Sequence, residues 1–288
     1  MKRAILIVAA ALLALTAVPR ARANGDFEAN RPITVVSRED GSGTRSAFIE
    51  LFGLLATTDD GGKKDMTTKE AIIADKTDII MANVAGDLYA IGYISLGSLN
   101  DTLKALNIDG AEATADNVRI GEYQASRPFI IATKGEAGEA ARDFIDFILS
   151  AEGQAIIGKS YIEVDAGAEA YAGGGVSGKI SVHGSSSVSP IMEKLKEAYV
   201  ELNPDASIEI QTTDSSAGLA AAIEGACDIG MSSRELKPSE EETLTGITIA
   251  IDGIAVVVNL GNPIDGLTKA QVCDIFTGAV EVWSEVAP

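Results

Sequence analysis

Three short turns rich in Gly, Ser and Thr have the composition of an anion-binding site. They are residues 41–44, 185–187 and 215–218, and each stands between an expected strand and an expected helix. The first N–H groups of a helix have no partner within the helix and carry partial positive charge. Glycine lets an anion approach the backbone, and Ser and Thr hydroxyls add donors. If the three turns converge, they would surround a tetrahedral oxyanion.

The same turns are also ordinary helix starts, because Ser and Thr are common N-caps and glycine is common in turns. A single turn of this kind would be interpreted as structural. Three of them on one α/β chain, one with an arginine beside it, favour anion binding. None has the full G-x-x-x-x-G-K-S/T pattern, so the sequence does not indicate nucleotide binding.

The arginine is Arg38, four residues before Ser42. A guanidinium can hold two oxygens of an oxyanion at once. We expect Asp40 to fix Arg38 through a salt bridge, and its carboxylate could also accept the proton of hydrogen phosphate, which sulfate lacks. The alternative is a surface pair between Arg38 and Asp40 worth about 0–1 kcal/mol.

Strands and helices are expected to alternate along the chain, which is typical of an α/β protein. Residues 166–178, with three consecutive glycines, have the composition of a flexible linker. We expect strands over residues 32–36, 89–94, 127–132, 179–183, 207–211, 228–231 and 247–259, and helices over residues 45–54, 69–74, 138–150, 190–202, 219–224 and 268–276.

Composition limits the functional class. The chain has 288 residues, 46% of them hydrophobic, which is enough for a sizeable core, and its net charge of −19 makes nucleic acid an improbable partner. With one histidine and two cysteines, a zinc site of the usual kind is not expected, and we expect no cofactor and no metal. Cys227 and Cys273 could pair in an oxidising compartment or remain small buried hydrophobes.

Residues 1–23 have the pattern of a secretion signal. Two basic residues precede an apolar run over residues 4–18, and Ala21-Arg22-Ala23 gives an A-x-A cleavage site. No cysteine follows the run, so there is no site for a lipid anchor. We therefore expect an exported protein, periplasmic or secreted.

Several motifs taken together resemble the phosphate-binding proteins of phosphate ABC transporters. The resemblance implies a type II periplasmic-binding-protein-like α/β fold with two lobes and a ligand cleft between them. It implies inorganic phosphate and membrane permease subunits as partners, no enzymatic activity, and a monomer. The motifs are ITVVSREDGSGTRSAFIEL at residues 33–51, AIGYISL at 90–96, RDFIDFILSAEGQ at 142–154, GSSSVSP at 184–190, DIGMSSRE at 228–235 and DIFTG at 274–278.

The resemblance also implies the ligand contacts of each lobe. Ser233 stands where some family members have an acidic proton acceptor, which leaves open how a phosphate proton is accepted here. The implied contacts are Arg38, Ser42, Gly43 and Thr44 in one lobe, with Asp40 behind Arg38, and Ser186, Ser187, Ser215 and Ser233 in the other.

The two halves stand in the opposite order from the family, so we expect a circularly permuted chain. Chain termini often lie close together, and a permuted chain can therefore rebuild the same fold. We expect one lobe over residues 32–126 and the second over 127–288, with one crossover near 126–128. The second lobe would combine 127–165, the linker 166–178, and 179–288.

Three alternatives remain at this point. The first is a binder of sulfate, molybdate or tungstate. The second is an enzyme such as a phosphatase, which would need a metal cluster or an activated nucleophile with a base. The third is an interaction module with no role in transport.

Overall fold

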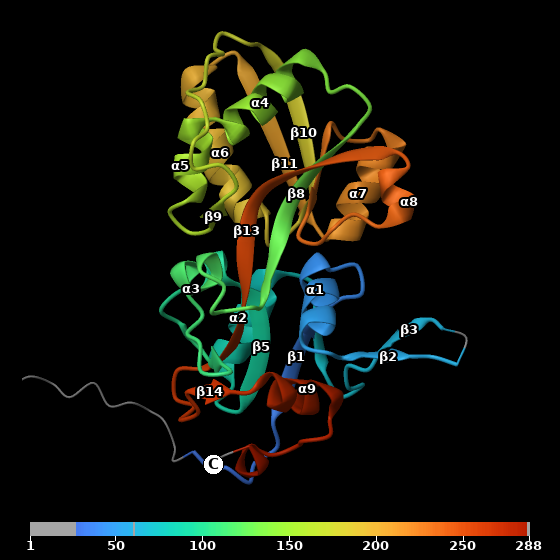
Figure 1. Ribbon diagram of the computed structural model, residues 1–288, viewed down its shortest axis with the longest axis vertical. Helices are drawn as coiled ribbons and strands as arrows, with labels where there is room; N and C mark the ends of the chain where they lie inside the picture. The colour runs from blue at the N-terminus through green and yellow to red at the C-terminus, as the bar shows by residue number, and fades with distance from the viewer. Residues whose placement is uncertain (1–26, 60, 287–288) are drawn as a thin grey trace, which may run out of the picture.

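Two α/β lobes, each with its own hydrophobic core, are joined through strands β8 (Ser126–Lys134) and β13 (Leu244–Asn259) (Figure 1). The computed structural model describes residues 27–59 and 61–286, so the expected secretion signal at residues 1–23 lies outside the described residues. Within the described part of the chain, no helix has both the length and the apolar character needed to cross a membrane. The predicted two-lobed α/β architecture is confirmed.

The first lobe is built on the strand order β13-β5-β1-β4, in which β1 runs parallel to both β4 and β5. All six residues of β5 are buried, as expected of a strand covered on both faces. Its core includes Phe48, which stacks on Tyr93 with ring centroids 3.9 Å apart. The elements are β1 (Thr34–Arg38), α1 (Gly43–Leu51), β2 (Leu55–Thr57), β3 (Lys63–Asp65), β4 (Ile72–Ala74), α2 (Thr77–Gly86), β5 (Ala90–Ser95), η1 (Leu96–Ser98), β6 (Leu103–Ala105), β7 (Asn107–Ile108), α3 (Ala115–Arg119), β14 (Gly266–Leu267), α9 (Lys269–Thr277) and η2 (Trp283–Glu285).

The second lobe follows the strand order β11-β10-β12-β8-β13. The apolar stripe predicted for residues 138–150 is confirmed as core, since Phe144, Ile145 and Ile148 are buried on one helix. Besides β8 and β13, the elements are α4 (Glu139–Leu149), α5 (Ala151–Ile157), β9 (Ile162–Glu163), β10 (Gly178–Ser185), α6 (Ser189–Leu202), β11 (Ala206–Thr213), α7 (Ser215–Glu224), β12 (Ile229–Ser232) and α8 (Pro238–Glu241).

The boundary between the lobes differs from the prediction. Residues from 254 to 286 pack in the first core, while the second core uses residues from 129 to 250. Strand β13 pairs with β8 over its first part and with β5 over its second part, so it passes from one lobe into the other. The prediction of a single crossover and a second lobe reaching residue 288 is therefore wrong. Apolar residues stand on both sides of the interruption at Asp252 and Gly253, and they do not show that the part before it packs in one core and the part after it in the other.

Local structure departs from prediction in two further places. The expected helix at residues 69–74 is a turn followed by β4, whose β-branched Ile72 and Ile73 pair with β1. Residues 166–177 have no regular structure, but Tyr171 anchors them: its hydroxyl donates to Asp143 and its ring contacts Phe147 edge-on. This linker is held against the second lobe.

The two cysteines are both free. Cys227 is buried in the second lobe, and Cys273 packs against the first core. Of the two possibilities left open by the sequence, the structure shows unpaired thiols.

Candidate functional site

Hydroxyl groups from both lobes meet one guanidinium in the interface between the lobes. None of these seven side chains belongs to a residue that is more than 7% exposed. We call this set the interlobe cluster: Arg38, Thr44, Thr77, Ser186, Ser187, Ser215 and Ser233.

Contacts within the cluster cross from one lobe to the other. Arg38 Nη2 donates to Ser186 Oγ at 3.1 Å, and Thr44 Oγ1 lies 2.8 Å from Ser187 Oγ. Thr77 Oγ1 lies 3.3 Å from Ser186 Oγ. The lobes are therefore closed on each other at this point.

Helix N-termini from both lobes point at the cluster. Helix α1 begins at Gly43 and α2 at Thr77 in the first lobe, while α7 begins at Ser215 and α6 begins two residues after Ser187 in the second. Each N-terminus presents N–H groups without an intrahelical partner and the positive end of the helix dipole. This arrangement favours a bound anion.

Arg38 ends strand β1 and is fixed from several sides. Its backbone N–H donates to Tyr93 Oη at 3.1 Å, and burial raises the pKa of Tyr93 to about 12, which keeps the phenol neutral. Its Nε and Nη2 donate to the two carboxylate oxygens of Glu39 at 2.8 and 2.7 Å. The guanidinium is therefore held in a fork, with its Nη atoms directed toward Thr77 and Ser186.

The prediction that Asp40 fixes Arg38 is wrong. The Asp40 side chain is 95% exposed and pairs with Arg45 Nη1 at 2.9 Å. The chain turns directly after β1, closed by a hydrogen bond from Ser42 N to Glu39 O. Within this turn the Glu39 side chain reaches Arg38, and Asp40 faces solvent.

The other predicted contacts fall into two groups. The first group comes together in the cluster and consists of Arg38, Thr44, Ser186, Ser187, Ser215 and Ser233. Gly43 lies against this group, since a Cβ on Gly43 would be 2.4 Å from Ser215 Oγ and 2.8 Å from Ser233 Oγ. Ser42 has a structural role, because its hydroxyl caps helix α1 by accepting from Arg45 N.

One member of the cluster, Thr77, and one residue that contacts it, Arg127, are not singled out from the sequence. Thr77 starts a helix that we did not predict, although a Thr followed by Asp78 and an apolar run is a recognisable helix start. Arg127 donates from Nη1 to Ser233 O at 3.1 Å. The sign of it in the sequence is a charged residue directly before the apolar run of residues 128–132.

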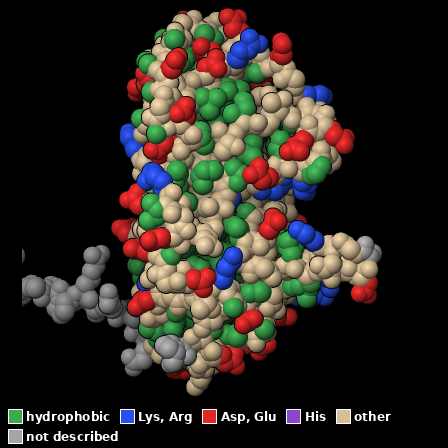
Figure 2. All heavy atoms as spheres, viewed as in Figure 1, with side chains coloured by type: hydrophobic (Ala, Val, Ile, Leu, Met, Phe, Trp, Pro, Cys, Tyr) green, Lys and Arg blue, Asp and Glu red, His purple; other side chains and the backbone are tan. Residues whose placement is uncertain are grey.

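A cavity of about 220 Å³ opens beside the cluster, and its lining includes Thr77 and Ser186. On the molecular surface, a notch separates the two lobes above the β2–β3 hairpin, with Lys or Arg side chains at its edge (Figure 2).

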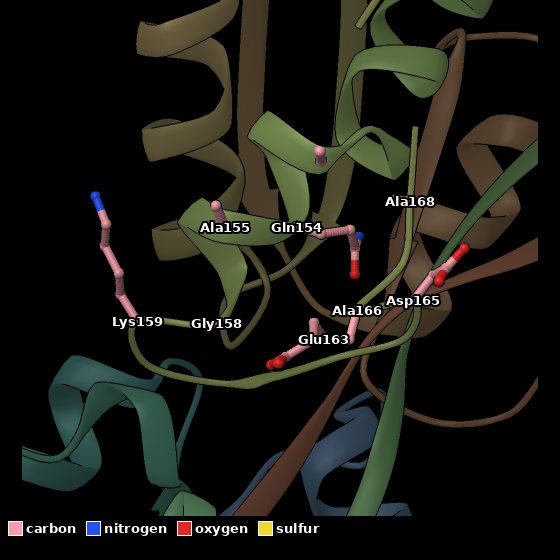
Figure 3. A pocket seen from close by; sticks show the side chains of 9 residues that line it. Gln154, Ala155, Gly158, Lys159, Glu163, Asp165, Ala166 and Ala168 are labelled. Carbon is pink, nitrogen blue, oxygen red and sulfur yellow. The ribbon is translucent and has the colours of Figure 1, made fainter. Parts of the chain in front are cut away.

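A larger hollow of about 370 Å³ lies elsewhere, on α5 and the segment after it. Its charged side chains do not converge: Lys159 extends away from it, and Glu163 and Asp165 point in opposite directions (Figure 3). The interlobe cluster is therefore the stronger candidate for a ligand site.

Comparison with known proteins decides the family. Residues 21–152 and 169–288 match the family model of the PBP superfamily domain. The phosphate-binding protein PstS 2 of Streptococcus agalactiae serotype V is 50% identical over 258 residues, which cover 88% of each chain. The chain belongs to the PstS family of the PBP superfamily.

Two further comparisons bear on this PstS-family chain. The crystal structure of a phosphate ABC transporter, phosphate-binding protein from Streptococcus pneumoniae superposes with a TM-score of 0.71 at 45% identity, covering 89% of this chain and 100% of that one. A phosphate-binding protein PstS from Staphylococcus saprophyticus matches over 119 residues at 35% identity, which is 38% of this chain and 37% of its own. The predicted family and the predicted periplasmic-binding-protein-like fold are confirmed.

Proposed function

We propose that this chain captures inorganic phosphate outside the cytoplasm and delivers it to the permease subunits of an ABC importer. The observation that carries this proposal is the interlobe cluster, in which Arg38 and hydroxyls from both lobes meet at helix N-termini. Support comes from the S. agalactiae relative, which is named a phosphate-binding protein, and from the S. pneumoniae structure, which is described as a phosphate ABC transporter component.

Binding would proceed by opening and closing of the lobes. When they part, the hydroxyl contacts across the interface break, and the same groups become free to donate to phosphate oxygens. Closure then surrounds the anion with Arg38, the hydroxyls of Thr44, Ser187 and Ser215, and the N-termini of four helices. A hydroxyl both donates and accepts, so Ser233 could accept the P–OH proton in place of a carboxylate.

We propose binding without chemical change, so the chain would not be an enzyme. Among the described residues, the hydroxyls of the cluster pair with one another, with the Ser185 hydroxyl, with the backbone N–H of Ser233 and with Arg38. A hydroxyl nucleophile needs an adjacent base. The cluster is therefore suited to hold an oxyanion rather than to cleave its esters.

Titration calorimetry with phosphate tests the proposal. Arg38→Ala should weaken binding by about 2–5 kcal/mol, since it removes a charged partner from a desolvated anion. Arg142→Ala, a change of an exposed arginine on α4, should leave the affinity as it is. An unchanged affinity in Arg38→Ala contradicts the proposed site, equal binding of sulfate or molybdate favours the other oxyanions, and hydrolysis of a phosphate ester favours an enzyme.

We also infer that the order of the two halves is a circular permutation relative to part of the family. The streptococcal relative matches over most of both chains, whereas the Staphylococcus protein matches over little more than a third of each, in support of this inference. A chain that starts at residue 178 and places residues 27–165 after residue 286 should fold and bind phosphate. Loss of folding in that chain would contradict the inference.

The same proposal includes four further properties of the chain. They are export directed by residues 1–23, the absence of a lipid anchor, a monomeric state and the lack of nucleic-acid binding. The acidic net charge of −19 supports the last of these. Cell fractionation with mass spectrometry of the mature N-terminus tests the export, and light scattering tests the monomer.

A further inference from the structure

A buried ion pair joins the two strands that connect the lobes. Arg127 in β8 and Asp252 in β13 are cross-strand partners, and Arg127 Nη2 lies 3.1 Å from Asp252 Oδ2. The side chains are 2% and 1% exposed. We call these two residues the hinge pair, because each of the two strands passes from one hydrophobic core to the other at its member of the pair.

The hinge pair contacts functional elements in both lobes. On the side of the second lobe, Arg127 Nη1 donates to the backbone carbonyl of Ser233 at 3.1 Å. On the side of the first lobe, Asp252 Oδ1 accepts from Ser95 Oγ at 2.9 Å, at the end of β5. A continuous chain of polar contacts thus runs from the interlobe cluster through the hinge to the first lobe.

Ser233 is the point at which this chain of contacts meets the ligand site. Its backbone N–H donates to Ser215 Oγ at 3.1 Å, and its Oγ accepts from Ser185 Oγ at 2.9 Å. Its carbonyl carbon would lie only 3.0 Å from a Cβ on Gly43. The position of the Ser233 backbone therefore sets both the hydroxyl arrangement in the second lobe and the surface on which α1 closes.

Stability alone does not account for the hinge pair. Desolvation of two charges largely offsets their attraction, and a hydrophobic pair of similar volume often stabilises a core equally well or better. Burial raises the pKa of the Asp252 carboxyl to about 6, in spite of the opposing effect of Arg127. The planar guanidinium, by contrast, can bond a carboxylate and a carbonyl in fixed directions at the same time.

We propose that Arg127 is a positioning residue. It holds the Ser233 backbone in the position needed for ligand binding, and through its ion pair with Asp252 it couples that position to closure of the lobes. The proposal rests on the proposed function for its ligand. It assigns to Arg127 no contact with phosphate.

Three variants separate positioning from stability. Arg127→Met with Asp252→Leu removes both charges and leaves no unpaired ion, and Arg127→Lys keeps a charge for Asp252 but loses the fork. The control is Asp143→Asn, which weakens the hydrogen bonds of two tyrosines in the second lobe, away from the cluster. Each protein is titrated with inorganic phosphate, melted, and examined by small-angle scattering with and without phosphate.

The double variant should fold and bind phosphate about 10-fold to 100-fold more weakly, which is the size of one hydrogen bond to a charged group. Arg127→Lys should unfold at nearly the same temperature as the wild type and still bind phosphate more weakly. Asp143→Asn should melt earlier with unchanged affinity.

Binding by the folded double variant within twofold of the wild type would overturn the proposal. If the double variant does not fold, the same result for Arg127→Lys would overturn it. If the wild type shows no binding of phosphate in the calorimetric titration, the proposed function is contradicted, and the role of the hinge pair is tested separately. In that case ligand-free scattering decides: a larger radius of gyration in a folded variant than in the wild type supports the hinge pair, and equal radii contradict it.

Discussion

Replacing Gly43 with alanine should separate ligand affinity from folding stability. Gly43 is the first residue of α1, and its φ is not in the left-handed region, so the helix itself accepts alanine. In the closed protein, however, the new Cβ would lie 2.4 Å from Ser215 Oγ and 3.0 Å from the carbonyl carbon of Ser233. The Ser215 hydroxyl can rotate, but the Ser233 backbone must move, so the clash acts on closure.

Overpacking of this kind typically destabilises by about 1–3 kcal/mol, which corresponds to about 5-fold to 150-fold in phosphate affinity if closure is required for binding. Calorimetric titration measures the affinity, and urea unfolding without phosphate measures the stability. Gly86→Ala is the matched control, because Gly86 ends helix α2 in the same lobe and a Cβ there would have open space. Equal affinities of Gly43→Ala and the wild type would refute the reasoning that the lobes close on this glycine.

Three further changes have defined outcomes. Asp40→Asn should alter phosphate affinity less than twofold, because its side chain is exposed and pairs with Arg45; a tenfold loss by calorimetry would restore the role predicted from the sequence. Phe48→Ala should lower the free energy of unfolding by about 3–5 kcal/mol, since it removes a buried ring stacked on Tyr93, and urea unfolding with a loss below 1 kcal/mol would contradict this packing. Because the pKa of Asp252 is raised, the folded state holds the Asp252 proton more tightly than the unfolded state, and this contribution to stability is present below about pH 4 and lost as pH rises through about 6. The free energy of unfolding of the wild type should therefore fall more steeply between about pH 4 and pH 6 than that of Asp252→Asn. Parallel curves for the two proteins would contradict the assignment.

Most of the cluster could be predicted from sequence because its residues lie in local strand–turn–helix patterns. The turns containing Thr44, Ser187 and Ser215 were recognised by their Gly and Ser content, and the structure brings them together. The partner of Arg38 could not be predicted in this way. Glu39 and Asp40 are adjacent carboxylates, and only the direction of the turn after β1 decides which one reaches back.

Features that depend on the path of the chain between lobes were also beyond the sequence. Strand β13 is apolar on both sides of Asp252 and Gly253, so its sequence does not show that these two parts pack in different cores. Arg127 and Asp252 lie far apart in the chain, and their pairing follows from the register of β8 and β13. Thr77 lies outside any Gly- and Ser-rich turn, because the N-cap of α2 is Lys76, so the composition that marks the other helix starts of the site is lacking there.

A crystal structure of the mature protein with phosphate would show whether the interlobe cluster holds the anion. The phosphorus atom should lie between the lobes, with the phosphate oxygens within hydrogen-bonding distance of Arg38, Thr44 and Ser187. Phosphate held on one lobe only, or in the hollow beside Lys159, would contradict this placement.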